Sequence, residues 1–376
     1  MSDYSRKRIL MQSLKLPLAK PQPDYREFMK AVTTSYEPRR TRLVEYLVNP
    51  PIQKEIMALL NRPWVEIQNP FRPVAGAPKD DIASVKAYYD NYIAMWYHLG
   101  YDFVRLELGM NFPKFVRAGG DHGRTYSETA RGPIQSWEDF EKYPWPNPSE
   151  ADFFPYEYVS KNLPEGMGMI CCHAAGPLEW IDMLMGYEFL CIALYEQPDL
   201  IKAVADKVES LVTQYIDRLL QLPGMIAYWQ GDDMGFRTGT LIGPDHLRQY
   251  VLPTHKRYAA KAHAKGIAYF LHSCGQIHDV MGDLIDDVKI DAKHSVEDAI
   301  NPVQEWKKRY GGRIGILGGV DLDKLTRSTP DDVRKYVRKI IDDCQPGGHF
   351  ALGSGNSIPD YIPVENYLTM LDEAFR

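Results

Sequence analysis

The sequence predicts a (β/α)8 barrel, a single domain of eight parallel strands and surrounding helices with its active site at the carboxyl ends of the strands. Three observations lead to this prediction. Short apolar runs recur along the 376 residues, amphipathic helical patterns separate them, and polar residues or glycines directly follow most of the runs. The length suits one large domain of this kind with insertions.

The predicted strands are short runs of β-branched and other apolar residues, as expected for parallel strands buried on both faces. The polar residues that follow them should gather at one edge of the sheet, because parallel strands end on the same side. The eight runs are residues 42–48, 103–109, 167–173, 225–230, 268–272, 290–294, 314–317 and 350–353.

Helical patterns, with apolar residues three and four positions apart, fill the connections. They cover residues 187–222, 244–265, 276–286, 301–309, 329–343 and 363–375. Thr329 precedes a proline and two aspartates, which is a strong signal for the start of a helix. A doubly wound sheet is the alternative fold, but no GxGxxG pattern follows the first run, so the barrel is preferred.

Two connections are too long for a single crossover helix. Residues 49–102 have room for two helices, and residues 1–40 are predicted to be an N-terminal extension. Residues 111–165 are rich in Pro, Trp and Tyr, which predicts an ordered excursion over the barrel mouth after the second strand. Such an excursion suits a lid or an oligomer contact. The whole chain, residues 1–376, is expected to form one domain.

Composition excludes several classes of protein. A net charge of −6 argues against nucleic acid as the main partner, because phosphate binding requires a basic face. No apolar run is long enough to cross a membrane, and the N-terminus lacks the apolar core of a secretion signal, so a cytoplasmic protein is expected. An odd number of cysteines, five, indicates a reducing compartment. The 24 tyrosines suit either ordinary packing or a site for an aromatic ligand.

The predicted fifth strand ends in His272, and Cys274 follows two residues later, before Gly275. Imidazole and thiolate are preferred zinc ligands, and both side chains can reach the barrel mouth from this position. The alternative is a buried histidine beside a buried cysteine with no metal. The position at a strand end favours the metal site.

Asp232 and Asp233 follow the predicted fourth strand, which contains Trp229. Two adjacent carboxylates are costly to bury unless they are paired, protonated or bound to a metal. They are therefore candidates for a general acid, a substrate anchor or a metal ligand, and the alternative is a helix cap or an Asx turn. Trp229 and Arg237, from the same strand and the loop after it, are predicted substrate contacts.

Other strand ends supply further candidates. His173 ends the third strand after two cysteines that are expected to pack in the core, and it is a predicted substrate contact. His294 ends the sixth strand and is predicted to act as a metal ligand or a proton shuttle. Ser354 and Asn356 follow the eighth strand, where the run forms either a cradle for a polar ligand or a simple turn.

Several motifs together resemble the uroporphyrinogen decarboxylase superfamily from about residue 38 to the C-terminus. These motifs are HSCG at 272–275, GGVDLDKL at 318–325 with STPDDVRKYV at 328–337, and GSGNSIPDYIPVENY at 353–367. GPLEW at 176–180, MGYEFL at 185–190 and GDDMG at 231–235 fit as well. The Arg-rich N-terminal motif of the true decarboxylases is missing, since residues 38–42 read PRRTR.

The resemblance therefore points to the branch of corrinoid-dependent methyltransferases, including O-demethylases. In that branch an H-x-C pair binds Zn²⁺ together with a cysteine near the eighth strand, and His272 and Cys274 match the pair. No cysteine follows the eighth strand here, and Cys344 lies before it, at the opposite end of the barrel. The third ligand is then expected to be Asp233, His294 or another carboxylate. Members of this family often form homodimers.

Three hypotheses follow. The first is a zinc-dependent methyltransferase that moves a methyl group from a small methoxylated substrate, either aromatic or not, to cobalamin on a separate corrinoid protein docked near residues 111–165. In this hypothesis Asp232 or Asp233 donates a proton or shares the metal. The second is a metal-independent decarboxylase or lyase in which Arg105 and Arg237 hold substrate carboxylates. The third is a non-enzymatic binding protein, which predicts that the residues at the strand ends tolerate replacement by alanine.

Overall fold

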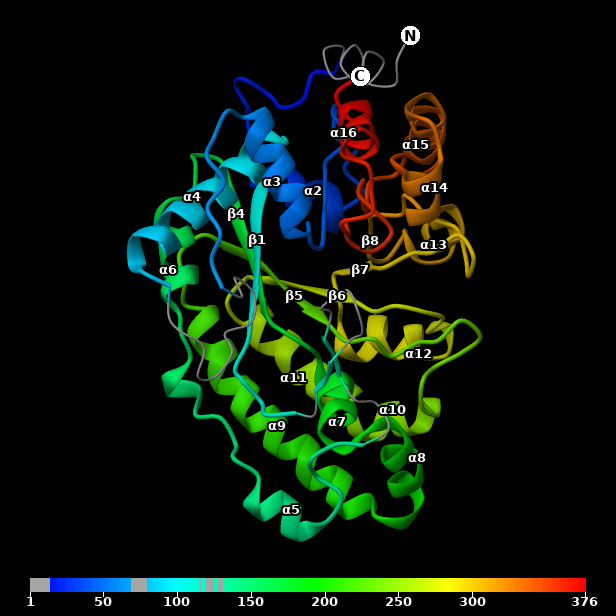
Figure 1. The fold of residues 1–376 in the computed structure, drawn as a ribbon. Helices are drawn as coiled ribbons and strands as arrows, with labels where there is room; N and C mark the ends of the chain where they lie inside the picture. Colours follow the sequence, from blue (N-terminus) through cyan, green and yellow to red (C-terminus); the bar gives the residue numbers. More distant parts are fainter. Residues whose placement is uncertain (1–13, 69–79, 115, 119–124, 128–130) are drawn as a thin grey trace.

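Seven parallel strands form a curved sheet in the computed structural model, which describes residues 14–68, 80–114, 116–118, 125–127 and 131–376 (Figure 1). Each strand pairs with the next one along the chain, in the order β1-β4-β5-β6-β7-β8-β9. The strands are β1 Phe103–Leu108, β4 Gly168–His173, β5 Met225–Gly231, β6 Ala268–His272, β7 Ala292–His294, β8 Gly315–Leu317 and β9 Phe350–Ala351. All seven lie within predicted strands or within one residue of them.

The first predicted strand, residues 42–48, does not join the sheet as a regular strand. It makes two isolated parallel bridges, from Leu43 to Leu352 and from Val48 to Ile358, with the segment that continues from β9. On its other side it meets β1 through side chains, since the Arg105 guanidinium lies 3.6 Å from the centre of the Tyr46 ring. The fold is therefore barrel-like, with a regular seven-stranded sheet in place of the predicted eight strands.

Helices cover the outer face of the sheet, and every predicted helical segment is confirmed in the structure. They are α2 Tyr25–Thr33, α3 Pro50–Leu59, α4 Ile82–His98, α5 Trp137–Lys142, α6 Phe154–Lys161, α7 Pro177–Met185, α8 Tyr187–Glu196, α9 Pro198–Leu219, α10 Pro244–Tyr250, α11 Leu252–His263, α12 His278–Asp283, α13 Val303–Tyr310, α14 Leu322–Arg327, α15 Pro330–Cys344 and α16 Val364–Glu373. A 3-10 turn, η1 Pro148–Glu150, and a π-helical turn, η2 Leu284–Val288, are the other helical segments in the described part of the chain.

Helix α15 illustrates how local sequence sets these boundaries. The Thr329 hydroxyl accepts a hydrogen bond from the Asp332 backbone N–H at 3.3 Å, and Pro330 occupies the first helical position, as predicted. The buried residues Val333, Val337, Ile340, Ile341 and Cys344 repeat at helical spacing and form one apolar face. This face packs on α13 and α16, so Cys344 is a core residue.

The long excursion after β1 contains a short antiparallel pair, β2 Val116–Ala118 and β3 Thr125–Ser127. It then runs beside α7, where the Ile134 N–H donates to the Leu184 carbonyl at 2.9 Å. Its last helix, α6, packs on α4 and leads into β4. Residues 119–124 and 128–130, which belong to the predicted cover of the mouth, lie outside the described residues.

Among the described residues, no helix is both long and apolar enough to cross a membrane.

Candidate metal centre

Side chains from successive strands point into the barrel and meet near its carboxyl end. Successive residues of a strand point to opposite faces, so alternate residues line the interior. His272 on β6 is paired in register with His294 on β7, and the two rings face each other. Trp229 on β5 also points inward, and its ring centre lies 5.1 Å from that of His294. The interior at this level is therefore lined by aromatic and imidazole rings.

Three potential metal ligands converge just beyond these rings. The ligand atoms of Asp233, His272 and Cys274 all lie within 4.8 Å of one another. His272 Nε2 is 3.5 Å from Cys274 Sγ and 3.6 Å from Asp233 Oδ1. In a tetrahedral zinc site with Zn–N of about 2.1 Å and Zn–S of about 2.3 Å, a nitrogen and a sulfur ligand are about 3.6 Å apart. The residues present thus fit a zinc ion, and Asp233, one of the expected candidates for the third ligand, lies at the right distance from His272.

The environment of Cys274 suits a metal-bound thiolate. Its sulfur accepts hydrogen bonds from the Ser295 hydroxyl at 3.4 Å and from the Asn356 side-chain amide at 3.3 Å. In the absence of a metal, burial and the nearby Asp233 carboxylate raise the pKa of Cys274 to about 12, so the free thiol keeps its proton. A divalent cation would replace that proton, because thiolate is the form that binds metals.

His272 and His294 have different hydrogen-bond partners. Their Nδ1 atoms are 2.8 Å apart, and His294 Nε2 lies 3.2 Å from the Ser354 carbonyl oxygen. Burial lowers the pKa of His294 to about 3 and places the pKa of His272 well below its usual range, with His294 as a further cause for His272. Both ring nitrogens of His294 thus have hydrogen-bond partners, and the converging ligand atoms are those of Asp233, His272 and Cys274.

Asp232, predicted as a catalytic residue, makes the contacts of a helix cap. Its carboxylate accepts hydrogen bonds from the Leu178 and Glu179 backbone N–H groups at 3.1 and 3.0 Å, at the start of α7. An N-cap side chain normally fills this role, but position 176 is a glycine, and a Cβ there would overlap Asp232. His255 Nε2 also lies 2.8 Å from the carboxylate. Asp232 is fully buried, so these contacts separate it from the more exposed Asp233.

His173, predicted as a substrate contact, points away from the barrel interior. Its neighbour Cys172 faces inward, toward Arg105 and Glu107, so alternation turns His173 toward the helices. The ring packs edge-on against Tyr215 of α9 at 4.9 Å, and its Nε2 accepts from the Met110 N–H at 3.0 Å. Burial lowers the pKa of His173 to about 4, which makes it a neutral core residue.

The remaining predicted substrate contacts differ in how deeply they are buried in the protein. Trp229 is fully buried inside the barrel, and Arg237 is exposed in the turn after β5. Ser354 is buried, and its hydroxyl donates to Glu45 at 2.7 Å, so its side chain holds the wall together. Asn356 alone of these residues touches the ligand cluster, through its contact with the Cys274 sulfur.

Sequence reasoning missed three interior residues, Glu45, Tyr46 and Glu107, and Tyr46 contacts a potential ligand directly. Its ring stacks on His272 with 4.0 Å between centres, and the Arg105 guanidinium lies over the same ring. Arg105 forms an ion pair with Glu107, and Glu45 is fully buried. The signal in the sequence is the interruption of two apolar runs by charged residues, at positions 45, 105 and 107.

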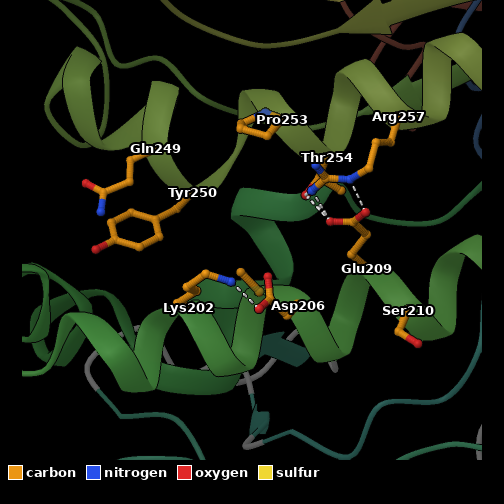
Figure 2. A pocket seen from close by; sticks show the side chains of 10 residues that line it. Lys202, Asp206, Glu209, Ser210, Gln249, Tyr250, Pro253, Thr254 and Arg257 are labelled. Atoms are coloured by element: carbon orange, nitrogen blue, oxygen red, sulfur yellow. Dashed lines mark hydrogen bonds and ion pairs between the residues drawn. The ribbon is translucent and has the colours of Figure 1, made fainter.

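A separate cavity of about 520 Å³ lies in the outer helical layer, between α9, α10 and α11 (Figure 2). Two ion pairs cross its lining, Lys202 with Asp206 and Arg257 with Glu209. None of its lining residues belongs to the barrel mouth, so this cavity is distinct from the ligand cluster.

Comparison with solved structures places the fold. A methyltransferase from Methanosarcina mazei superposes with a TM-score of 0.64 at 14% identity, over 93% of this chain and 97% of that chain. A putative vitamin-B12 independent methionine synthase from Listeria monocytogenes gives a TM-score of 0.49 at 10% identity, over 92% and 97%. At these identities the likeness concerns the fold.

Sequence comparison identifies the family. No curated protein sequence matches the chain. A family model described as uroporphyrinogen decarboxylase (URO-D) matches residues 125–376, well over half of the chain. This segment includes all three members of the ligand cluster. The chain belongs to the uroporphyrinogen decarboxylase family.

Proposed function

We propose that this protein is a zinc-dependent methyltransferase that moves a methyl group from a small methoxylated, aromatic substrate to cobalamin on a separate corrinoid protein. The observation that carries the proposal is the cluster of Asp233, His272 and Cys274, whose ligand atoms lie within 4.8 Å of one another. The M. mazei methyltransferase shares the fold, which supports the reaction class.

The number of ligands suits a catalytic site. Structural zinc sites use four protein ligands, whereas catalytic ones use three and leave a position for a water or a substrate. When bound, zinc would act as a Lewis acid and polarise the substrate heteroatom that carries the methyl group. Asp233 has 41% of its side chain exposed, compared with 7% for His272, so we expect the open position on the Asp233 side, toward the mouth.

The protein supplies the surfaces around this position. Tyr46 and Trp229 pack edge to face and form an aromatic wall beside the ligand cluster. The Tyr46 hydroxyl has no hydrogen-bond partner among the described residues, so it is available to a substrate oxygen. Glu179, at the start of α7, is a second polar group near the cluster, because burial and the Asp233 carboxylate raise its pKa to about 8. Glu179 therefore holds a proton at neutral pH that it can donate to the departing oxygen.

The proposed reaction also requires a partner protein. A corrinoid carrier must bring its cobalt to the methyl group, so it has to dock over the carboxyl ends of the strands. We expect the described ends of the excursion and the exposed Phe236 and Arg237, in the turn after β5, to border this contact. Homodimer formation is compatible with this arrangement if the dimer contact leaves the mouth open.

The decarboxylase alternative has weaker support in the site. Holding substrate carboxylates requires cationic groups that converge on one position. Arg105 is buried and already pairs with Glu107, and Arg237 is exposed in a turn. A metal-independent decarboxylase would keep its activity after metal removal, so chelation separates the two functions.

The first experiment measures metal in protein purified without chelator, together with His272→Ala and Cys274→Ala. We expect about one zinc per chain in the wild type and loss of zinc in both variants. Cys191→Ala is the matched control, because Cys191 is a partly exposed cysteine on α8 that should not affect the metal. Absence of zinc even after reconstitution would contradict the proposal. Protein that holds zinc is then assayed with methoxylated aromatics and reduced cobalamin.

A further inference from the structure

We propose that His294 is a positioning residue, the last member of a hydrogen-bonded chain from Glu45 through Ser354 that presents His272 to the metal through an unprotonated Nε2. This inference rests on the proposed metal site and adds to it the group that orients one of its ligands. It assigns to His294 a role other than ligand or proton shuttle.

The chain begins at a buried carboxylate. Glu45 is fully buried and accepts hydrogen bonds from both the hydroxyl and the backbone N–H of Ser354, at 2.7 and 3.2 Å. These two bonds tie the segment 42–48 to the turn after β9 and fix the direction of the Ser354 peptide. The Ser354 carbonyl oxygen then lies 3.2 Å from His294 Nε2.

The next two links assign the protons. A carbonyl oxygen only accepts, so His294 Nε2 must carry the proton in its bond to Ser354. A neutral imidazole has a single N–H, which leaves His294 Nδ1 as an acceptor. His272 Nδ1, 2.8 Å away, must then be the donor. The lone pair of His272 consequently lies on Nε2, the atom that faces Cys274 and Asp233.

Packing keeps the two rings in this relation. Tyr46 stacks on His272 with 18° between the ring planes, and the Trp229 and His294 rings meet edge to face at 87°. A Cβ at Gly318 would overlap the Ser354 carbonyl oxygen, so glycine is required where His294 reaches this oxygen. Rotation of either imidazole would break a buried hydrogen bond, which is costly. Partners of this kind fix the tautomer of a metal-bound histidine.

The chain offers variants that separate this role from simple packing. His294→Phe keeps a ring but removes the acceptor for His272 Nδ1. His294→Gln keeps an acceptor and a donor. His255→Phe is the matched control, because His255 is another fully buried histidine with both ring nitrogens bonded, to Tyr269 and Asp232, outside the chain of contacts.

The experiment measures the affinity for Zn²⁺ and Co²⁺ alone, by competition with a chelator, and the absorption spectrum of bound Co²⁺. We expect His294→Phe to weaken zinc binding by about 10–100-fold, which is typical for loss of such a partner. His294→Gln should restore most of the affinity, and His255→Phe should leave affinity and spectrum unchanged. Wild-type affinity in folded His294→Phe, or an equal loss in His255→Phe, would overturn the inference.

A second measurement requires no variant to fold and no metal to bind. In metal-free wild-type protein labelled with ¹⁵N on its 10 histidines, long-range ¹H–¹⁵N spectra report the tautomer of each ring. We expect His272 to carry its proton on Nδ1 and His294 on Nε2. A proton on His272 Nε2 contradicts the inference, whether or not the protein binds zinc. Failure to bind zinc with the expected tautomers would instead count against the proposed function alone.

Discussion

The phenol ring of Tyr46 lies against the imidazole of His272, with 4.0 Å between ring centres and 18° between planes. The Arg105 guanidinium lies over the same phenol ring, 3.6 Å from its centre. One side chain thus links the proposed metal ligand to the buried ion pair of Arg105 and Glu107. Because Tyr46 belongs to the segment that completes the barrel wall, the position of that segment and the orientation of His272 depend on each other.

Replacing Tyr46 by leucine should weaken both contacts of this ring. Aromatic pairs and cation–π contacts each contribute about 0.5–2 kcal/mol, so we expect Tyr46→Leu to lose about 1–3 kcal/mol of unfolding free energy. Tyr46→Phe keeps the ring and should lose less than about 1 kcal/mol while retaining zinc. Urea denaturation and zinc analysis measure the two effects. Equal stability of the leucine and phenylalanine variants would show that the stacking contributes nothing.

Replacement by alanine should destabilise the protein far more at Asp232 than at the adjacent Asp233. Asp232→Ala leaves two N–H groups of α7 and His255 without a buried partner, which should cost about 3–5 kcal/mol of stability. Asp233→Ala removes a half-exposed side chain and should cost about 1 kcal/mol or less.

Metal binding should show the reverse order for the same pair. Loss of a group that only hydrogen-bonds a ligand costs about 10–100-fold in affinity, so loss of the ligand Asp233 should cost more than about 100-fold. Folded Asp232→Ala should bind zinc nearly as well as the wild type. Chelator competition on both variants tests this. Normal zinc affinity in Asp233→Ala would show that Asp233 is not a zinc ligand.

Glu45 should make stability depend on pH in a defined direction. Burial raises its pKa to about 7 in the folded protein, from the ordinary value of 4.5. The folded state therefore binds the proton more tightly, and this contribution is full below about pH 4.5 and is lost as the pH rises through 7. The shift corresponds to about 3 kcal/mol. The difference in unfolding free energy between wild type and Glu45→Gln should fall by this amount between pH 4.5 and 7, and a flat difference would contradict it.

Gly318→Ala should destabilise the protein more than a second glycine replacement with the same backbone requirement. Gly318 and Gly266 have φ angles of +81° and +70°, so alanine is strained at both by about 1 kcal/mol. At Gly266 nothing lies within 4 Å of the new methyl group, whereas at Gly318 it meets the Ser354 carbonyl. Thermal unfolding should show a clearly larger loss for Gly318→Ala, with weaker zinc binding. Equal losses would mean that the Ser354 carbonyl moves away from the new methyl group without loss of stability.

The sequence predicts the proximity of Asp233, His272 and Cys274 because parallel strands end at the same edge of a sheet. His272 and Cys274 follow one apolar run and Asp233 follows its neighbour, so proximity of the three required only the correct strand order. The same rule made His294 a candidate, and His294 does lie beside His272. Its contact with Ser354, which decides its role, depends on the loop geometry at Gly318 and is invisible in the spacing of motifs.

Two features needed tertiary information. The choice between Asp232 and Asp233 depends on α7, whose start at Gly176 lacks a capping side chain and takes the carboxylate of Asp232 instead. Tyr46 and Glu45 lie inside a run that predicts an apolar strand. A strand pattern alone assigns such positions to packing of the sheet. Charged and phenolic side chains within a run are tolerated here because they satisfy one another inside the barrel.

The family match begins at residue 125, yet Glu45, Tyr46, Arg105 and Glu107 all precede it. The matched segment supplies the three ligands, and the unmatched segment supplies the surface that faces them. A change in segment 42–48 would therefore reach His272 by two routes, through the Tyr46 ring and through the contacts of Glu45 with Ser354.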